Sequence, residues 1–320
     1  MKLELKTPLL AAAMTVAAGS AFAADVVIPD PNYASGRATA YAVKAVIEDA
    51  LGLEVEMVNT TAVPVIWEAM SRGSGEIDVW TETWLPNQQG LVERYVEEEG
   101  TVTLSDKTFP AIQGYCVPEK TYEELGIRSV FDLANPENAA KFDRDGDGQG
   151  EIWIGPQGWQ STNIETIRAR DYGFADFFEL QSTDEAVATA GLDAAIKAGE
   201  PWVGYCYGPH QNFALYDLKL LEEPAYDPEK FVVVTPDEDP DWLQKSTVAS
   251  AYADASVRIA WSTSLEERQP ELVELLRRIE LTDEDVNAWS LAIVEGQEPE
   301  DVASKWVAEN PELVAEWMSR

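Results

Sequence analysis

Apolar and polar positions alternate along the chain in a way that predicts helices and strands in regular order. Residues 35–51 carry apolar side chains at helical spacing, with Ser35 placed to cap the helix and Gly52 to end it. The elements expected next are a strand at 53–58, a helix at 63–71 and, after a glycine-rich turn at 73–75, a strand at 76–80. Strand, helix and strand at this spacing are typical of a parallel βαβ unit.

A second set of elements of the same kinds begins near residue 111. Strands are expected at 114–117, 151–155 and 201–207. Thr162 and Glu165 have the spacing of a capping box, which predicts that a helix starts there, between the last two strands. After a strand-like run at 231–235 the pattern predicts helices to the end of the chain, and these begin near Pro270, Pro299 and Pro311.

Two α/β halves of this kind predict a protein of two lobes. A chain of 320 residues is longer than one compact core usually fills. With strand-like crossings near Pro110 and Val234, the first lobe comprises 24–110, the second lobe 111–234, and a helical return to the first lobe 235–320. Ligands bind in the cleft between such lobes, at the carboxyl ends of parallel strands.

The first 23 residues have the pattern of a secretory signal peptide. An apolar, small-residue run at 8–18 follows two early lysines, and Ala21-Phe22-Ala23 has the form of a cleavage site. The alternative, a membrane anchor, needs about 20 apolar residues, and Gly19 and Ser20 close this run too early. We therefore expect a periplasmic protein, cleaved after about Ala23 and without a lipid anchor.

The net charge of the chain limits the kinds of molecule that it can bind. The chain has 23 Lys and Arg against 58 Asp and Glu, a formal net charge of -35. Phosphates would be repelled over the whole surface, so a nucleic-acid partner is excluded, and docking on anionic lipid is disfavoured. Such acidity is also typical of a solvated, salt-tolerant surface, and it says little about a ligand.

The two cysteines, Cys116 and Cys206, each lie in a strand-like run. An oxidising periplasm would permit them to pair if their strands are neighbours. Two buried free thiols fit the sequence equally well, so the sequence leaves the pairing open.

Motifs for catalysis are missing from the sequence. His210 is the only histidine, and no GxSxG, HExxH, CxxC or Walker A pattern occurs. An ATPase is thereby excluded, and a hydrolytic triad has no serine elbow. Paired-carboxylate catalysis is not excluded by motif, because so many acids always provide pairs. We expect no enzyme and no cofactor for activity.

Tryptophan is abundant, with 11 residues, and its positions matter more than its number. Four tryptophans lie in helical patterns and are expected to pack in the core: Trp67, Trp289, Trp306 and Trp317. Trp84 and Trp159 instead follow strands in turn sequence, and Tyr207 ends a strand. These three rings either close the lobe cores or converge on the cleft.

Convergent aromatic faces bind a methylated ammonium, because the ring quadrupole attracts a delocalised positive charge that donates no hydrogen bonds. Trp159 directly precedes the expected helix start, where free backbone N–H groups around Gln160 and Ser161 can receive a carboxylate or an oxide. Rings for the cation and a helix start for the anion together indicate a site for a small zwitterion.

Four segments make the resemblance to one family specific: DVWTETWLPN (78–87), GPQGWQST (155–162), WVGYCYGPH (202–210) and VASKWVAENPELVAEW (302–317). They resemble the glycine betaine/choline/proline family of substrate-binding proteins of ABC importers, over nearly the whole mature chain. The resemblance implies a type II periplasmic-binding-protein fold, α/β with two lobes, each a mostly parallel sheet flanked by helices. It also implies an ABC permease and its ATPase as partners.

The resemblance also assigns residues to an aromatic cage. Trp84 and Trp159 match cage tryptophans, and Tyr207 takes a place that is Trp in some members. Tyr33 resembles an N-terminal cage aromatic in a weaker motif. Trp80 and Glu82 flank Trp84 and are expected to line the cleft, and of these two we include Trp80 among the ligand-binding residues. Because Tyr207 departs from all-tryptophan cages, the ligand stays open among glycine betaine, choline, trimethylamine N-oxide and dimethylsulfoniopropionate.

A separate acidic motif has the spacing of half a calcium loop. Its ligands would be Asp143, Asp145, Asp147, the main-chain carbonyl of Gln149, and Glu151. The twelfth position, which should be a bidentate Glu, is Ile154, so another segment must complete the sphere or no metal binds. Carboxylates this close repel one another without a cation, which favours a structural calcium ion over an ordinary acidic turn.

The leading hypothesis is therefore a monomeric transport receptor that captures a small methylated-ammonium solute. Two alternatives use the same cleft: a periplasmic enzyme acting on a small amine, and a sensory receptor. Recovery of unchanged ligand would separate the receptor from the enzyme, but the sequence does not distinguish transport from sensing.

Overall fold

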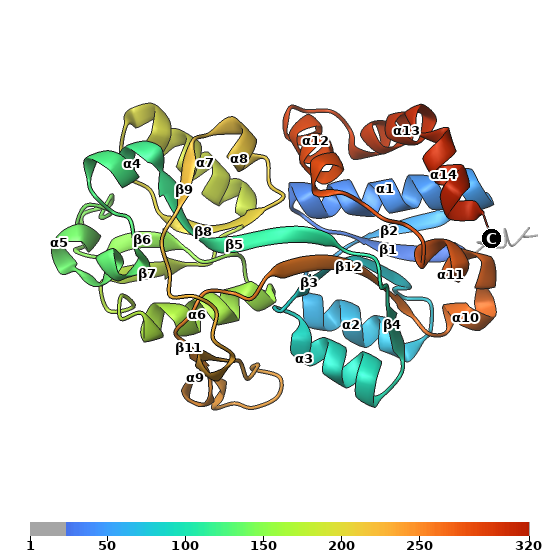
Figure 1. Cartoon of the computed structure of the whole chain (residues 1–320), viewed down its shortest axis with the longest axis horizontal. Coiled ribbons are helices and arrows are strands. Elements are labelled where there is room, and N and C mark those ends of the chain that lie inside the picture. Colours follow the sequence, from blue (N-terminus) through green and yellow to red (C-terminus); the bar gives the residue numbers. More distant parts are fainter. Residues whose placement is uncertain (1–23, 320) are drawn as a thin grey trace, which may run out of the picture.

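The chain forms two α/β lobes joined by two adjacent strands, as the computed structural model shows (Figure 1). The structure describes residues 24–319, so the predicted signal peptide at 1–23 lies outside the described residues. Across 24–319, no helix combines the length and the apolar character that a membrane span requires.

The first lobe is built around β1 (Val26–Asp30), whose first four residues are buried. Strand β2 (Val55–Asn59) pairs with β1 in parallel. On the other side of β1, the amide of Asp78 donates to the carbonyl of Val27 at 2.9 Å, which places β3 (Val79–Leu85) there. Strands β2 and β3 of the expected βαβ unit are therefore not neighbours in the sheet. The buried strand β1 lies between them.

Helices cover the sheet of this lobe, and α12, α13 and α14 pack along α1 (Figure 1). The other elements of the lobe are α1 (Ala34–Leu51), α2 (Val63–Arg72), α3 (Gln89–Val92), a π-helical turn (Glu93–Glu98), β4 (Val102–Leu104), β12 (Ala255–Ser262), α10 (Leu265–Arg268), α11 (Pro270–Leu276), α12 (Asp283–Val294), α13 (Pro299–Glu309) and α14 (Pro311–Met318). The prolines expected near helix starts are the first residues of α11, α13 and α14, which confirms that prediction.

The N-terminal cap of α1 differs from the prediction. The helix starts at Ala34, its N-cap is Tyr33, and no side chain caps it. Ser35 is buried inside the first turn, so its hydroxyl is not placed to act as the cap. Gly52 does end the helix, with φ of 66° and its amide bonded to the carbonyl of Glu48.

The second lobe carries a mixed sheet in which β6 pairs in parallel with both β7 and β8. Its elements are α4 (Glu119–Glu124), a 3₁₀ turn (Val130–Ala134), α5 (Pro136–Ala139), β6 (Gly150–Trp153), α6 (Gln160–Asp171), β7 (Phe178–Gln181), α7 (Glu185–Ala198), β8 (Gly204–Gly208), α8 (Asn212–Leu215), β9 (Leu218–Leu220), a second 3₁₀ turn (Pro228–Lys230), β10 (Phe231–Val232), α9 (Trp242–Lys245) and β11 (Thr247–Val248).

Two strands cross between the lobes side by side (Figure 1). Strand β5 (Phe109–Pro118) pairs antiparallel with β12 at its start and antiparallel with β8 further on. Strand β12 also pairs antiparallel with β3. The sheets are therefore less uniformly parallel than expected, because the crossing strands run against their neighbours.

The return to the first lobe lies later than Val234. Residues 235–250, which we assigned to the returning part of the first lobe, pack on α6 of the second lobe: Arg170 donates to the carbonyl of Ser246 at 2.7 Å, and Val248 donates to Asp171 at 2.6 Å. The chain then returns through β12, a strand where the pattern predicted only helices. The interval 235–250 stays on the second lobe because α6 satisfies its backbone groups.

Candidate ligand-binding site

A cavity lies between the two lobes. All seven residues predicted to bind ligand line it, three from the first lobe and four from the second: Tyr33, Trp80, Trp84, Trp159, Gln160, Ser161 and Tyr207. The other lining residues were not selected as ligand-binding, and only Glu82 among them was expected at the cleft: Val63, Glu82, Asn87, Gln88 and Tyr205.

Strand periodicity explains how the two sheets supply these side chains. Alternate residues of a strand point to the same face. In β3 these are Trp80, Glu82 and Trp84, and in β8 they are Tyr205 and Tyr207, all of which line the cavity. The same signal could have found Tyr205, which lies two residues before the predicted cage aromatic Tyr207.

Trp159 is delivered by a glycine-rich turn between β6 and α6. Gly155 and Gly158 have φ of 97° and 94°, a backbone conformation that favours glycine. A Cβ on Gly155 would lie 2.8 Å from Oγ1 of Thr162, so only glycine fits this close turn. The carbonyl of Gly158 also accepts from the amide of Val63 at 3.3 Å, a hydrogen bond between the two lobes.

Four aromatic rings form a cage of nearly perpendicular faces. The centroids of Tyr33 and Trp159 are 5.0 Å apart with an interplanar angle of 72°. Trp159 and Tyr207 are 5.7 Å apart at 78°, and Tyr207 and Trp84 are 5.3 Å apart at 87°. All four side chains are at most 9 % exposed. Tyr33 and Trp84 come from one lobe and Trp159 and Tyr207 from the other, so the cage forms only when the lobes meet.

The carboxylate of Glu82 holds two of these rings by their polar edges. Its Oε2 accepts from Nε1 of Trp84 at 2.8 Å and from the hydroxyl of Tyr33 at 3.4 Å, and its Oε1 accepts from Thr39 at 2.7 Å. Glu82 is 1 % exposed. Burial raises the pKa of Glu82 to about 7, although the three donated hydrogen bonds oppose the rise.

A second carboxylate, that of Glu185 in α7, binds the hydroxyl of Tyr207 on the side away from the cavity. The hydroxyl of Tyr207 donates to Oε2 of Glu185. Nε2 of His210 lies 3.4 Å from Oε1 of Glu185, and the imidazole contacts the edge of the Tyr207 ring with centroids 4.7 Å apart. Burial, followed by the nearby Glu185 charge, raises the pKa of Tyr207 well above its usual value, so the phenol keeps its proton.

The start of α6 differs from the predicted capping box. The helix begins at Gln160, its N-cap is Trp159, and no side chain caps it. Thr162 instead donates to the carbonyl of Pro156 at 2.7 Å, and Glu165 is fully buried against Arg168 at 2.7 Å. The first amides of α6 are therefore left without a side-chain acceptor at the cavity wall.

Trp159 adds an unused donor at the same place. Its Nε1 is buried, and within residues 24–319 it makes no hydrogen bond. Together with the uncapped helix start, this donor gives the second-lobe side of the cavity a surplus of N–H groups.

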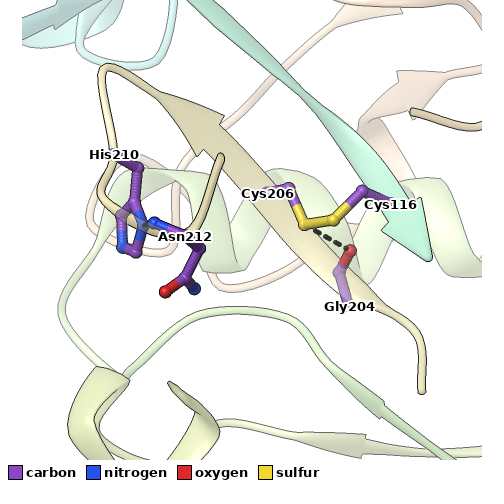
Figure 2. Close-up of a disulfide and its surroundings, with 5 residues drawn as sticks. All are labelled: Cys116, Gly204, Cys206, His210 and Asn212. Carbon is purple, nitrogen blue, oxygen red and sulfur yellow. Dashed lines mark hydrogen bonds between the residues drawn. A yellow bond between two sulfur atoms is a disulfide. The ribbon is translucent and has the colours of Figure 1, made fainter. Parts of the chain in front are cut away.

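A disulfide lies behind the cage. Cys116 of β5 and Cys206 of β8 are bonded, with their Cα atoms 5.7 Å apart, which settles the pairing that the sequence left open (Figure 2). Cys206 directly precedes Tyr207, and its Sγ lies 3.6 Å from the carbonyl of Gly204. The bond therefore joins the strand that carries Tyr207 to a strand that crosses between the lobes.

The acidic loop before β6 brings together three of its five predicted ligands. Carboxylate oxygens of Asp143, Asp145 and Glu151 lie within 4.8 Å of one another. Asp147 lies outside this group, and its Oδ1 accepts from the amide of Gln149 at 2.8 Å. Arg144 contacts Glu151 at 3.2 Å and supplies a positive charge there.

The fold and the cage define a two-lobed protein that encloses a small ligand. A family model described as the substrate-binding domain of an ABC-type glycine betaine transport system matches residues 24–309. The chain belongs to this family.

Curated relatives match parts of the chain. The glycine betaine/carnitine transport binding protein GbuC of Listeria monocytogenes is 27% identical over 143 residues, which cover 44% of this chain and 40% of that protein. The glycine betaine/proline betaine-binding periplasmic protein of Escherichia coli is 20% identical over 230 residues, which cover 72% of this chain and 69% of that protein.

Solved structures show the fold over most of the chain. The lactococcal OpuAC complexed with glycine betaine, in its closed-liganded conformation, has a TM-score of 0.71 at 21% identity, and the match covers 92% of this chain and 99% of that one. An ABC-transporter choline-binding protein in complex with choline also has a TM-score of 0.71 at 21% identity, with 92% and 91% covered. These likenesses confirm the predicted type II periplasmic-binding-protein fold.

Proposed function

We propose that this protein captures a small methylated-ammonium solute between its lobes and delivers it to an ABC importer. The observation that carries the proposal is the cage of Tyr33, Trp84, Trp159 and Tyr207, whose four rings contact one another and line one cavity. Aromatic faces attract a quaternary ammonium, which a polar pocket would have to desolvate without forming hydrogen bonds to it. The uncapped start of α6 and Nε1 of Trp159 supply donors for an oxygen at the other end of the ligand.

The family and the curated relatives support the transport role and a periplasmic location. The relatives named above are transport binding proteins, and that of Escherichia coli is periplasmic. In this role the ligand shifts an equilibrium between open and closed lobes, and a membrane permease with its ATPase recognises the closed form. A monomer suffices, because one chain supplies every ring of the cage.

Calorimetry with glycine betaine, choline and trimethylamine N-oxide tests the proposal. Trp84→Ala, Trp159→Ala and Tyr207→Ala should each weaken binding by about 1 to 3 kcal/mol, from lost ring attraction and lost apolar burial. Tyr207→Phe should cost much less, because it keeps the ring. Tyr226→Ala, which removes an aromatic side chain that is 45 % exposed, is the matched control.

Two outcomes would contradict the proposal. If Trp159→Ala bound all these ligands as wild type does, the cage would not be the binding site. If the bound ligand were recovered chemically changed, the protein would be an enzyme acting in the same cleft.

We also propose a structural calcium ion at the acidic loop, on the strength of the three converging carboxylates of Asp143, Asp145 and Glu151. Oxygen ligands of this kind suit calcium, and the ion would offset their mutual repulsion. Calcium should raise the melting temperature of wild type and not of Asp143→Asn/Asp145→Asn. Asp147→Asn, outside the group, is the matched control and should keep the response. A wild-type melting temperature unchanged by calcium and by chelator would show that the loop is only a turn.

A further inference from the structure

Two buried carboxylates, one from each lobe, hold the polar edges of the cage rings. Glu82 on β3 of the first lobe accepts from Trp84 and Tyr33, and Glu185 on α7 of the second lobe accepts from Tyr207. Their side chains are 1 % and 5 % exposed. Three of the four cage rings therefore have a buried carboxylate at their hydrogen-bonding atom.

Neither carboxylate has a Lys or Arg partner in the described part of the chain. Glu82 forms no ion pair among residues 24–319, and no Lys or Arg of this range lines the cavity. Glu185 accepts from the hydroxyl of Tyr207 and lies 3.4 Å from Nε2 of His210, and Nδ1 of that imidazole accepts from the amide of Asn212 at 3.1 Å.

A buried carboxylate without a counter-ion is unfavourable, and proteins usually pair such a charge or hold it protonated. Of the two carboxylates, Glu82 lines the cavity, whereas Glu185 lies behind Tyr207 and reaches the cavity only through that ring. Resting on the proposed function, we propose that Glu82 and Glu185 are the fixed counter-charge of the cage, and that the site selects a ligand of net positive charge over a zwitterion of similar size.

The same hydrogen bonds act on the rings. An N–H or O–H that donates to a carboxylate shifts electron density into its aromatic ring, which makes the face of Trp84 or Tyr207 more negative. A more negative face attracts an ammonium more strongly. A zwitterion gains the same attraction at its ammonium, but its own carboxylate is repelled by both glutamates in a site of low dielectric.

The ratio of choline affinity to glycine betaine affinity tests the inference. Both ligands carry a trimethylammonium group, but choline has net charge +1 and glycine betaine has none. Wild type at pH 8 should bind choline more tightly. Glu82→Gln and Glu185→Gln keep a side-chain acceptor for the ring edges and remove the charge, so each should lower the choline-to-betaine ratio by about tenfold.

Glu97→Gln, an exposed neutralisation, is the matched control and should leave the ratio unchanged. A merely structural role would weaken both ligands equally, so an unchanged ratio in both variants would overturn the inference, as would a wild-type preference for glycine betaine. If one variant fails to fold, the other still decides. Failure of the proposed function is distinguishable, because wild type would then bind none of choline, glycine betaine and trimethylamine N-oxide. Binding of trimethylamine N-oxide without choline would leave the proposed function standing and overturn the inference, since that ligand has no net charge.

Discussion

At the scale of single residues, the cage combines two requirements that oppose each other. The rings of Trp84 and Tyr207 line the cavity, and both residues are buried, so their N–H and O–H groups lie in the protein interior. A buried donor without an acceptor is costly. Glu82 and Glu185 supply the acceptors, and they fix the rotation of each ring at the same time. Trp159 is the exception, since its Nε1 has no acceptor among the described residues.

Glu82 should make the stability of the ligand-free protein depend on pH. Burial raises its pKa from 4.5 to about 7, so the folded protein holds this proton more tightly than the unfolded chain does. The free energy of unfolding therefore falls as pH rises from about 4.5 to about 7, and the loss is complete above that window. Glu82→Gln, which does not titrate, should be more stable than wild type by about 2 to 3 kcal/mol at pH 8 and nearly equal to it at pH 4.5.

Urea unfolding of both proteins at the two pH values measures this difference. The groups that face Glu82 are Tyr33, whose own pKa is raised well above its usual value by burial, and Glu185, whose charge adds to the rise at Glu82. Tyr33 stays neutral throughout the window. An advantage of Glu82→Gln that was the same at both pH values would assign the effect to packing and not to charge.

At the scale of elements, the sequence predicted secondary structure best where no tertiary contact competed with the local pattern. The strand-end aromatics could be found because β3 and β8 end where a turn residue follows. The capping box failed although its spacing is present, because Glu165 is needed in the second lobe: it accepts from Tyr252 at 2.6 Å and pairs with Arg168. Tertiary contacts outweighed a local capping preference.

Strand β12 shows a different kind of error. Its buried residues include Val257, Ile259 and Trp261 at alternate positions, a strand pattern visible in the sequence. The prediction of helices from 235 to the end of the chain is therefore wrong for this segment. Strand β1 was missed because it is short and continuously apolar, a pattern that periodicity alone does not assign.

The disulfide should stabilise the second lobe and the strand that carries Tyr207. It closes a loop of 90 residues, and removing a native disulfide of this kind costs about 2 to 5 kcal/mol of unfolding free energy. Cys116→Ala/Cys206→Ala should therefore unfold at lower urea than wild type. Dithiothreitol should lower the stability of wild type towards that of the variant.

The double variant is its own control for the reductant, because it has no other cysteine to reduce. If dithiothreitol destabilised the variant as much as wild type, its effect would not act through this bond. Equal stability of oxidised wild type and the variant would mean that β5 and β8 are held by their hydrogen bonds and packing alone.

At the scale of the whole molecule, the two-lobed organisation followed from the sequence, but the course of the chain between the lobes did not. The interlobe site is assembled from residues as distant in sequence as Tyr33 and Tyr207. Patterns report local periodicity, so they found the elements that carry these rings. They could not show that 235–250 packs on α6. In those contacts this segment offers backbone groups to side chains of α6, and backbone groups leave no signature in the sequence.

The large negative charge of the whole protein should contribute little to affinity. Exposed charges are screened over about 8 Å at physiological ionic strength, whereas Glu82 and Glu185 are buried beside the cage and are screened far less. Raising NaCl from about 0.05 to about 0.5 M should thus change the Kd for choline or glycine betaine by less than about threefold. Glu97→Lys/Glu98→Lys, which reverses two exposed charges, should leave both affinities close to those of wild type. Calorimetry in low and high salt measures both effects. A choline affinity that collapsed in high salt, and fell in the charge-reversal variant, would place its source on the acidic surface and not in the closed cavity.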